Sequence, residues 1–291
     1  MWHIPYELFI SLRYLKARRK QAFVSVISFI SISGVAIGVM ALIIVLGVMT
    51  GFSDDLRTKI LGAKSHLVVY QMGAGMPDYR QIIQELTSVP GVVSATPAML
   101  NQEKISSPSN TVGPMIKGID VASAPTVTNL GSIIKEGSLA DLNKELPSGL
   151  PGIILGKELA LILGVVTGDE IKVIAPFGTM TPAGRVPRAS RFQVAGIFDS
   201  GMYEYDSSLA YISLAQAQAF FNQPDVATEI EVKVEDIYRV KQLALKVQEH
   251  LGTRYQVRDW MEMHKNLYAA LKLEKMAMFV ILVLIILVAS F

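Results

Sequence analysis

The longest apolar stretch of the chain covers residues 21–53 and contains no Asp, Glu, Lys, Arg or His. A helix of about 20 residues crosses the ~30 Å hydrocarbon core of a bilayer. A secretory signal would have a shorter apolar core and a small-residue cleavage site, which the end of this stretch, Val48 to Phe52, lacks. We therefore expect a retained transmembrane helix over residues 21–52.

The charges that flank this helix predict its orientation. Residues 13–20 carry five basic side chains, whereas residues 54–59 carry two acidic and two basic ones. Excess positive charge stays on the cytoplasmic side, so we expect the N-terminus in the cytoplasm. Apolar residues at positions 4, 8, 12 and 15 recur at helical spacing, and residues 1–20 are expected to form an interfacial helix.

A second uncharged apolar run covers residues 276–291, where the sequence ends. At ~1.5 Å per residue it reaches only about 24 Å. We expect residues 275–291 to be the start of a second transmembrane helix and the chain to be truncated there. Small residues in the first helix recur at spacings of three and four, which favours close helix packing, although such residues are also common in membrane helices generally. The expected packing residues are Ser31, Gly34, Gly38 and Ala41.

Residues 53–274 show the patterns of a folded α+β domain. Strict alternation at 229–234 is typical of a half-buried strand, and Asp78 is expected to cap a helix. Strand–helix–strand patterns at both ends predict a split βαβ layer from residues 53–119 and 214–274, and the Gly- and Pro-rich residues 120–213 predict an inserted β-rich subdomain. Strands are expected at 65–72, 92–100, 114–119, 152–155, 170–175, 191–198, 208–212, 229–234 and 254–258, and helices at 78–88, 156–163 and 236–251.

The composition excludes several kinds of function. A net charge of +2 does not create the basic field that nucleic acid requires, and the absence of cysteine excludes thiolate chemistry and cysteine zinc sites. The segment Gly152 to Glu158 has three residues between its glycines instead of four and Glu where a phosphate loop has Ser or Thr. We expect no catalytic residue, no metal site and no cofactor in this chain.

One segment between expected strands, residues 176–187, is longer than an ordinary hairpin loop of two to five residues. It contains three prolines, two glycines and the apolar Phe177 and Met180. Exposed apolar side chains on a long loop are costly unless a partner covers them. The segment is interpreted either as a partner-binding loop or as a locally packed surface loop.

Several segments together resemble the LolC/LolE family, the permease subunits of the lipoprotein-releasing ABC transporter. They include Ser33 to Leu42, Ile154 to Ala160, Gly168 to Val173, Thr181 to Pro187 and Glu274 to Met276, and cover essentially the whole chain. The resemblance implies a multi-pass inner-membrane protein of four transmembrane helices with a MacB-type periplasmic domain between the first and second. It also implies a transport subunit rather than an enzyme.

The partners implied by the resemblance are a cytoplasmic LolD-like ATPase that binds ATP and Mg²⁺, and a second permease subunit, identical or LolE-like. The family extracts triacylated lipoproteins from the membrane lipid and passes them to a LolA-like periplasmic chaperone. In its LolC branch a projecting hairpin, the hook, captures the chaperone, with help from a neighbouring polar surface for which Lys172, Arg188 and Arg191 are the nearest candidates. The matching hook residues are Pro176, Phe177, Gly178, Thr179, Met180, Thr181, Pro182, Ala183, Gly184, Arg185, Val186 and Pro187.

The mechanism that we expect is ATP-driven movement of the first and second helices, which squeezes acyl chains out of a cavity between two permease subunits. Each buried methylene contributes ~0.8 kcal/mol, so a lipoprotein needs a driven step to leave. The alternative for each lining residue is ordinary lipid or helix packing. The expected lining residues are Met40, Val48, Met49, Phe52, Met276, Phe279 and Val283.

Two other functions remain open. A MacB-like efflux or cell-division permease shares the architecture, and the long loop at residues 176–187 favours lipoprotein release over it. A membrane-anchored sensor or scaffold is the third class. The second apolar run and the small-residue face argue against it, because they predict a partner with several helices.

Overall fold

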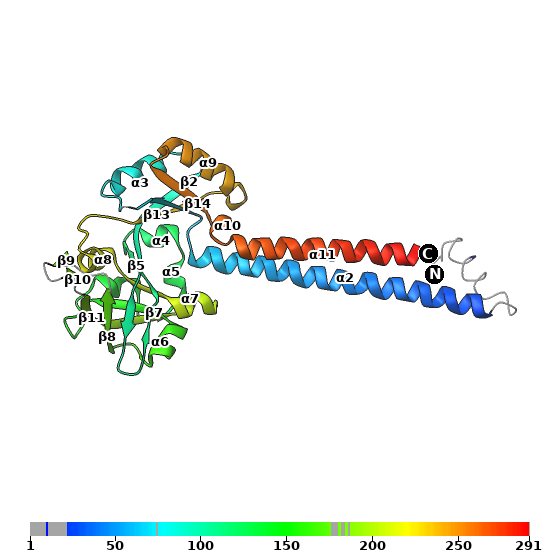
Figure 1. The fold of residues 1–291 in the computed structure, drawn as a ribbon, viewed down its shortest axis with the longest axis horizontal. Helices are drawn as coiled ribbons and strands as arrows, with labels where there is room; N and C mark the ends of the chain where they lie inside the picture. The colour runs from blue at the N-terminus through cyan, green and yellow to red at the C-terminus, as the bar shows by residue number, and fades with distance from the viewer. Residues whose placement is uncertain are drawn as a thin grey trace, which may run out of the picture. The chain divides into compact units, whose positions relative to one another are not determined.

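The computed structural model describes residue 10 and residues 22–290, apart from residues 74, 176–179, 182–183 and 186. The chain forms two compact units (Figure 1). The helical unit comprises Met1–Asp55 and Asn266–Phe291, and the sheet unit comprises Leu56–Lys265.

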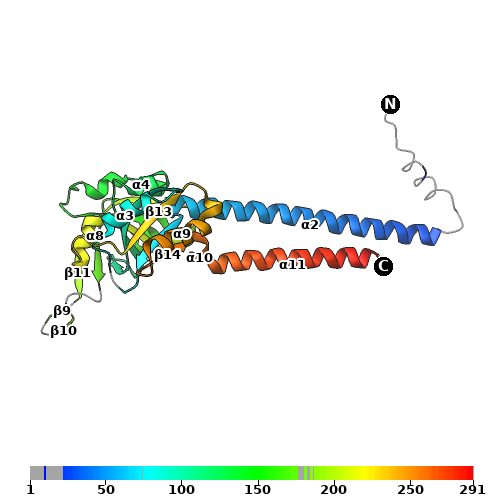
Figure 2. The same cartoon turned by 90° about the horizontal axis from the view of Figure 1, so that it is seen from above.

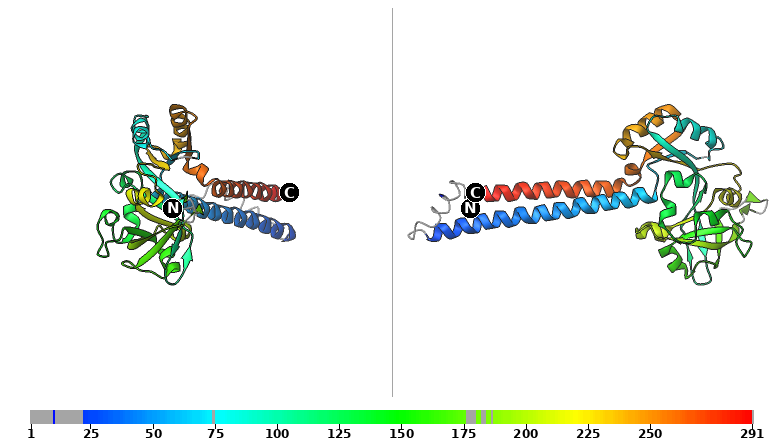
Figure 3. Two further views of the ribbon diagram at one scale, coloured as in Figure 1. Left: turned by 60° about the vertical axis from the view of Figure 1, so that its left-hand side comes forward. Right: turned by 180° about the vertical axis from the view of Figure 1, so that it is seen from behind.

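Two long helices, α2 (Ala22–Ala63) and α11 (Lys265–Ser290), run side by side in every ribbon view (Figures 1, 2 and 3). Within the described residues, Val26–Asp55 of α2 is the one helical stretch long and apolar enough to cross a membrane. Its large side chains are exposed, with Phe29 at 71% and Ile43 at 65%, as expected for a surface that lipid covers. The expected first helix is confirmed, but it continues to Ala63 because no proline or glycine interrupts residues 53–61.

The predicted split βαβ layer is confirmed at one end of the sheet. Its elements are β1 (Leu67–Gln71), α3 (Tyr79–Thr87), β2 (Val92–Gln102), β13 (Glu229–Val234), α9 (Val240–Leu251) and β14 (Tyr255–Asp259). β13 pairs antiparallel with both β1 and β2, so those two strands are parallel to each other with β13 between them. β1 separates β13 from β14 in the same way, and α3 and α9 provide the two crossovers.

The β-rich strands continue the same sheet rather than forming a separate one. They are β3 (Lys104–Ser106), β4 (Thr111–Val112), β5 (Met115–Ile119), β6 (Ile134–Glu136), β7 (Gly152–Gly156), β8 (Glu170–Ala175), β11 (Arg188–Phe198) and β12 (Leu209–Ser213). The order is β14-β1-β13-β2-β5-β12-β7-β11-β8-β3-β4, with β6 against β11. The short β3–β4 hairpin, which the sequence places in the split layer, instead pairs with β8.

The centre of this sheet is buried on both faces. On β7, Ile153 and Leu155 belong to one apolar cluster and Ile154 to another, because alternate side chains of a strand point to opposite faces. The first cluster includes side chains from α6 (Lys157–Leu163) and α8 (Leu214–Phe221), and the second includes side chains from α4 (Ala124–Val127), α5 (Leu130–Ile133) and the 3-10 helix η1 (Leu139–Asn143). The remaining short helices are α7 (Tyr203–Ser208), η2 (Ile237–Arg239) and α10 (Trp260–Met263).

All nine strands expected from the sequence are present within a few residues of their predicted ends. The expected helix at 236–251 begins as η2 and becomes α-helical at Val240. Asp78 lies at the N-cap of α3, but the prediction that it caps the helix is wrong for its side chain. That carboxylate instead accepts a hydrogen bond of 3.0 Å from the hydroxyl of Tyr255 and lies 3.3 Å from Arg254.

Candidate functional site

The expected hook joins two paired strands. β8 and β11 are antiparallel, and their register brings Ala175 opposite Arg188, which closes the segment 176–187 at its base. Beyond that base, β9 (Met180–Thr181) pairs antiparallel with β10 (Gly184–Arg185), so the backbone of the segment forms a hairpin. Pro187 is exposed. Seven of the expected hook residues lie outside the described residues: Pro176, Phe177, Gly178, Thr179, Pro182, Ala183 and Val186.

Arg188 fixes the base of this hairpin to a neighbouring helix. Its Nη1 donates hydrogen bonds to the carbonyl oxygens of Ala219, at 3.2 Å, and Phe220, at 3.0 Å, in the last turn of α8. A cation at a helix C-terminus satisfies free carbonyls and stabilises the helix by ~0.3–1 kcal/mol. The structure therefore gives Arg188 a positioning contact, and its expected contact with a chaperone stays a prediction.

Lys172 and Arg191 lie next to each other on the exposed side of the β8–β11 ladder. They are register partners on neighbouring strands, and side chains directly opposite in a sheet share one face. Nη1 of Arg191 lies 3.4 Å from Oε2 of Glu170, with the two side chains 70% and 49% exposed. An ion pair this exposed contributes little, so both cations remain accessible beside the base of the hairpin.

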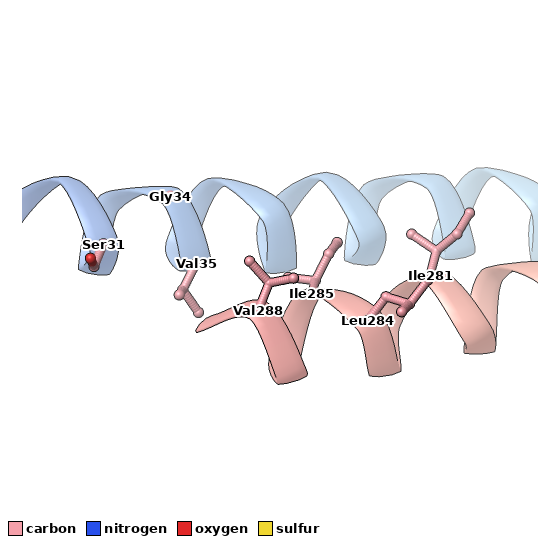
Figure 4. A pocket seen from close by; sticks show the side chains of 7 residues that line it. All are labelled: Ser31, Gly34, Val35, Ile281, Leu284, Ile285 and Val288. Atoms are coloured by element: carbon pink, nitrogen blue, oxygen red, sulfur yellow. The ribbon is translucent and has the colours of Figure 1, made fainter. Parts of the chain in front are cut away.

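In the helical unit, α2 and α11 line an open apolar cavity of about 450 Å³ (Figure 4). Val35 points toward α11, and Ile281 and Ile285 point toward α2. The lining residues are Ser31, Gly34, Val35, Ile281, Leu284, Ile285 and Val288.

The four small residues expected to form a packing face on α2 have different surroundings. At Gly38, an added Cβ would lie 3.3 Å from Cγ2 of Ile285, so the two helices approach closely there. Ser31 and Gly34 line the cavity, and Ala41 is exposed. The contact between the two helices of this chain therefore uses one of the four expected positions.

The expected lipid-lining residues lie away from that cavity. Met49 is half-buried and the other six are exposed, from 44% for Val283 to 66% for Phe279. Apolar side chains this exposed form a surface suited to contact with lipid or with a further helix. The exposed members are Met40, Val48, Phe52, Met276, Phe279 and Val283.

Sequence reasoning missed a buried polar cluster in the sheet unit. Lys117 on β5 places its Nζ 2.7 Å from Oε1 of Glu231 and 3.3 Å from Oε1 of Glu229, both on β13. Burial would lower the pKa of Lys117, but the two carboxylates raise it above its ordinary value. The available signal was the pair of glutamates on an alternating strand. A half-buried strand is expected to expose its polar face to water, but Glu231 is 3% exposed.

This cluster lines a cavity of about 210 Å³. Lys64, Tyr205 and Met263 also line it, and the buried hydroxyl of Ser65 in its wall has no hydrogen-bond partner among the described residues. Within those residues, no group of His, Asp or Glu side chains could hold a metal ion.

Comparison with known proteins finds relatives that match both units of the chain. A family model described as the MacB-like periplasmic core domain matches residues 28–250. The lipoprotein-releasing system transmembrane protein LolC of Neisseria meningitidis serogroup B is 34% identical over 289 residues, which cover 98% of this chain and 68% of that protein. LolC of Xylella fastidiosa (strain Temecula1) is 35% identical over 287 residues, which cover 99% of this chain and 68% of that protein.

The two branches of the family are both represented among the relatives. LolE of Haemophilus influenzae is 27% identical over 97% of this chain and 68% of that protein, and LolC of the same organism is 25% identical over 99% of this chain and 70% of that protein. The chain thus belongs to the LolC/LolE family of lipoprotein-releasing system transmembrane proteins and carries a MacB-like periplasmic core domain.

Proposed function

We propose that this chain is the permease subunit of an ABC transporter that extracts lipoproteins from the bacterial inner membrane and passes them to a periplasmic chaperone for the outer membrane. The observation that carries the proposal is the 34% identity to a LolC protein over 98% of the chain. That match includes the apolar helix, the sheet unit and the hairpin at its β8–β11 edge. The function therefore rests on the whole arrangement rather than on a single motif.

The proposed topology is that of a multi-pass protein with its N-terminus in the cytoplasm. The basic residues 13–20 precede the apolar stretch Val26–Asp55, and positive charge is retained on the cytoplasmic side. The unit Leu56–Lys265 then lies in the periplasm, and α11 returns the chain toward the membrane.

The energy source in this proposal is a separate LolD-like ATPase, which binds ATP and Mg²⁺ on the cytoplasmic side. The second permease subunit is a copy of this chain or a LolE-like protein. Acyl chains of a triacylated lipoprotein would leave the membrane past the exposed apolar side chains of α2 and α11, Met49 and Phe52 among them. At ~0.8 kcal/mol per methylene, this step requires coupling to nucleotide binding or hydrolysis.

The hairpin at residues 176–187 is the proposed chaperone contact. Its base is held by Arg188 on α8, and Lys172 and Arg191 place two accessible cations beside it. A base held in this way suits capture of a soluble partner, because less conformational entropy is lost on binding.

Site-specific photo-crosslinking from Thr181 tests this assignment. The probe is placed in the full-length protein in membranes, with Val166, 64% exposed in the same unit, as the control position. We expect a crosslink to a small soluble periplasmic protein from position 181 alone, lost on Pro182→Ala or Arg185→Ala. Equal crosslinking from both positions, or none from either, would contradict the hook.

A MacB-like efflux permease is the second candidate, because the matching family model is named for MacB. It predicts that the probe at position 181 captures a large envelope-channel component instead of a small soluble protein. The sizes of the crosslinked products therefore separate the two functions.

A further inference from the structure

One tyrosine contacts the residues that border both long helices on the side of the sheet unit. Lys64 follows Ala63, the last residue of α2, and His264 precedes Lys265, the first residue of α11. Nζ of Lys64 lies 4.7 Å from the centroid of the Tyr205 ring. The hydroxyl of Tyr205 lies 3.1 Å from Nε2 of His264. Tyr205 is 7% exposed, and its two partners Lys64 and His264 are half-buried.

Hydrogen bonds and close backbone packing hold α7, the helix that carries Tyr205, in place. The next residue, Asp206, is 3% exposed, and its Oδ1 accepts hydrogen bonds from the backbone N–H of Ser200, at 2.9 Å, and from its hydroxyl, at 2.8 Å. A Cβ added at Gly156 on β7 would lie 2.2 Å from the carbonyl oxygen of Asp206. The backbone of α7 is thus packed directly on β7 and tied to the segment that follows β11.

One strand, β11, connects the segment that holds α7 to the hairpin. β11 ends at Phe198, two residues before Ser200, and begins at Arg188, the base of the hairpin. A displacement of α7 is therefore passed along β11, which is held on both sides by β7 and β8. Paired strands deform little along their length, because every shift would break several ladder hydrogen bonds.

The ammonium group of Lys64 has a second set of partners available across the cavity. It forms no ion pair with a described carboxylate and is held by the Tyr205 ring, a cation–π contact. The cavity of about 210 Å³ that it lines also exposes Glu229 and Glu231. An open cavity with a lysine on one wall and carboxylates on another permits two discrete arrangements, which close packing would forbid.

We infer that Tyr205 is a positioning residue that couples α2 and α11 to the hairpin. It holds Lys64 and His264 together in one state, and in the other Lys64 moves across the cavity to Glu229 and Glu231. Driven motion of the helices then reaches the hairpin through α7 and β11. This inference rests on the proposed function only for the origin of that motion.

Spin-label distances test the coupling without reference to what is transported. The chain contains no cysteine, so Leu161→Cys and Leu273→Cys, at positions 67% and 72% exposed, place one label in each unit of the full chain. We expect the main peak of the distance distribution to be broader in Tyr205→Leu than in the parent protein. Tyr205→Phe, which keeps the ring for Lys64, should broaden it less.

The matched control is Tyr203→Phe, two residues earlier and 68% exposed, which should leave the peak unchanged. A peak that is as narrow in Tyr205→Leu as in Tyr203→Phe would overturn the inference. So would equal broadening in both, because the effect would then belong to α7 in general.

The second readout is coupling in the transporter reconstituted with its ATPase and a lipoprotein. Loss of one hydrogen bond shifts an equilibrium by roughly two- to tenfold, so Tyr205→Phe should reduce lipoprotein released per ATP by about that factor while ATP hydrolysis is unchanged. A parallel loss of hydrolysis and release would indicate misfolding and refute a coupling role. If the parent releases no lipoprotein at all, the proposed function fails, and the distance measurement still decides the role of Tyr205.

Discussion

The replacement Lys117→Met should destabilise the sheet unit strongly and in a pH-dependent way. Methionine keeps much of the length of the side chain but removes the ammonium group that lies 2.7 Å from Glu231 and 3.3 Å from Glu229. The side chains of the three residues are only 11%, 4% and 14% exposed. Two carboxylates would therefore remain in a site that water barely enters.

The size of the effect follows from this burial. Removing one partner of a buried ion pair costs about 3–5 kcal/mol. The unit Leu56–Lys265 comprises about 210 residues, for which the unfolding entropy is roughly 0.4 kcal/mol/K. The melting temperature should therefore fall by about 10 °C at neutral pH.

The sign of the pH dependence is fixed by the carboxylates. Burial already raises the pKa of Glu229 above its ordinary value, and loss of the nearby cation raises it further. The folded state then holds a proton that the unfolded state releases, so stability is present at low pH and is lost as pH rises. The destabilisation should be small near pH 5 and full near pH 8.

Thermal unfolding of the full chain in detergent, followed by tryptophan fluorescence, measures this change. Trp260 is 3% exposed within the sheet unit, and the background Trp2→Phe makes it the only tryptophan of the chain. Adding Glu229→Gln and Glu231→Gln to Lys117→Met should recover most of the lost stability, because no buried charge remains. Lys241→Met on the exposed side of α9 is the control.

Two results would refute the electrostatic reasoning. One is a loss of stability that is the same at pH 5 and pH 8. The other is a triple variant no more stable than Lys117→Met alone, which would assign the whole effect to packing.

Three further predictions concern other parts of the chain. Burial raises the pKa of Glu103 to about 7, so stability should fall as pH rises from about 5 to 7, and Glu103→Gln should remove that slope in pH-dependent melting curves. Gly156→Ala would bring its Cβ to 2.2 Å from the carbonyl oxygen of Asp206 and should lower the melting temperature by several degrees, at ~1–3 kcal/mol. A carboxylate in place of Met49 or Phe52 should abolish lipoprotein release at an equal membrane level, and unchanged release in an extraction assay would remove that residue from the proposed lining.

Local pattern was sufficient wherever one interaction dominates. The charge-free residues 21–53 predicted α2 because a bilayer accepts only segments whose backbone hydrogen bonds are satisfied internally. Alternation at 229–234 predicted β13. Sequence order also predicted the split βαβ layer, since strand–helix–strand units have few ways to close.

Other features depended on which strands became neighbours. The β3–β4 hairpin pairs with β8, and the short length of these strands gives no signal for that choice. Alternation shows that a strand has two different faces but not whether the polar face is covered, so it did not predict the burial of Glu231. Lys117 covers it from β5, two strands away in the sheet.

Contiguous residues specify the membrane helix, the type of domain that follows it, the place of the long hairpin and the family, so these features could be predicted from local pattern. The contact of Arg188 with the end of α8 and the meeting of Lys64, Tyr205 and His264 depend on the tertiary fold. The last two of these are 59 positions apart, and Lys64 lies much farther from both along the chain. Contacts at such separations form when the sheet closes, because the free energy that favours them comes from burial and pairing that no local pattern records.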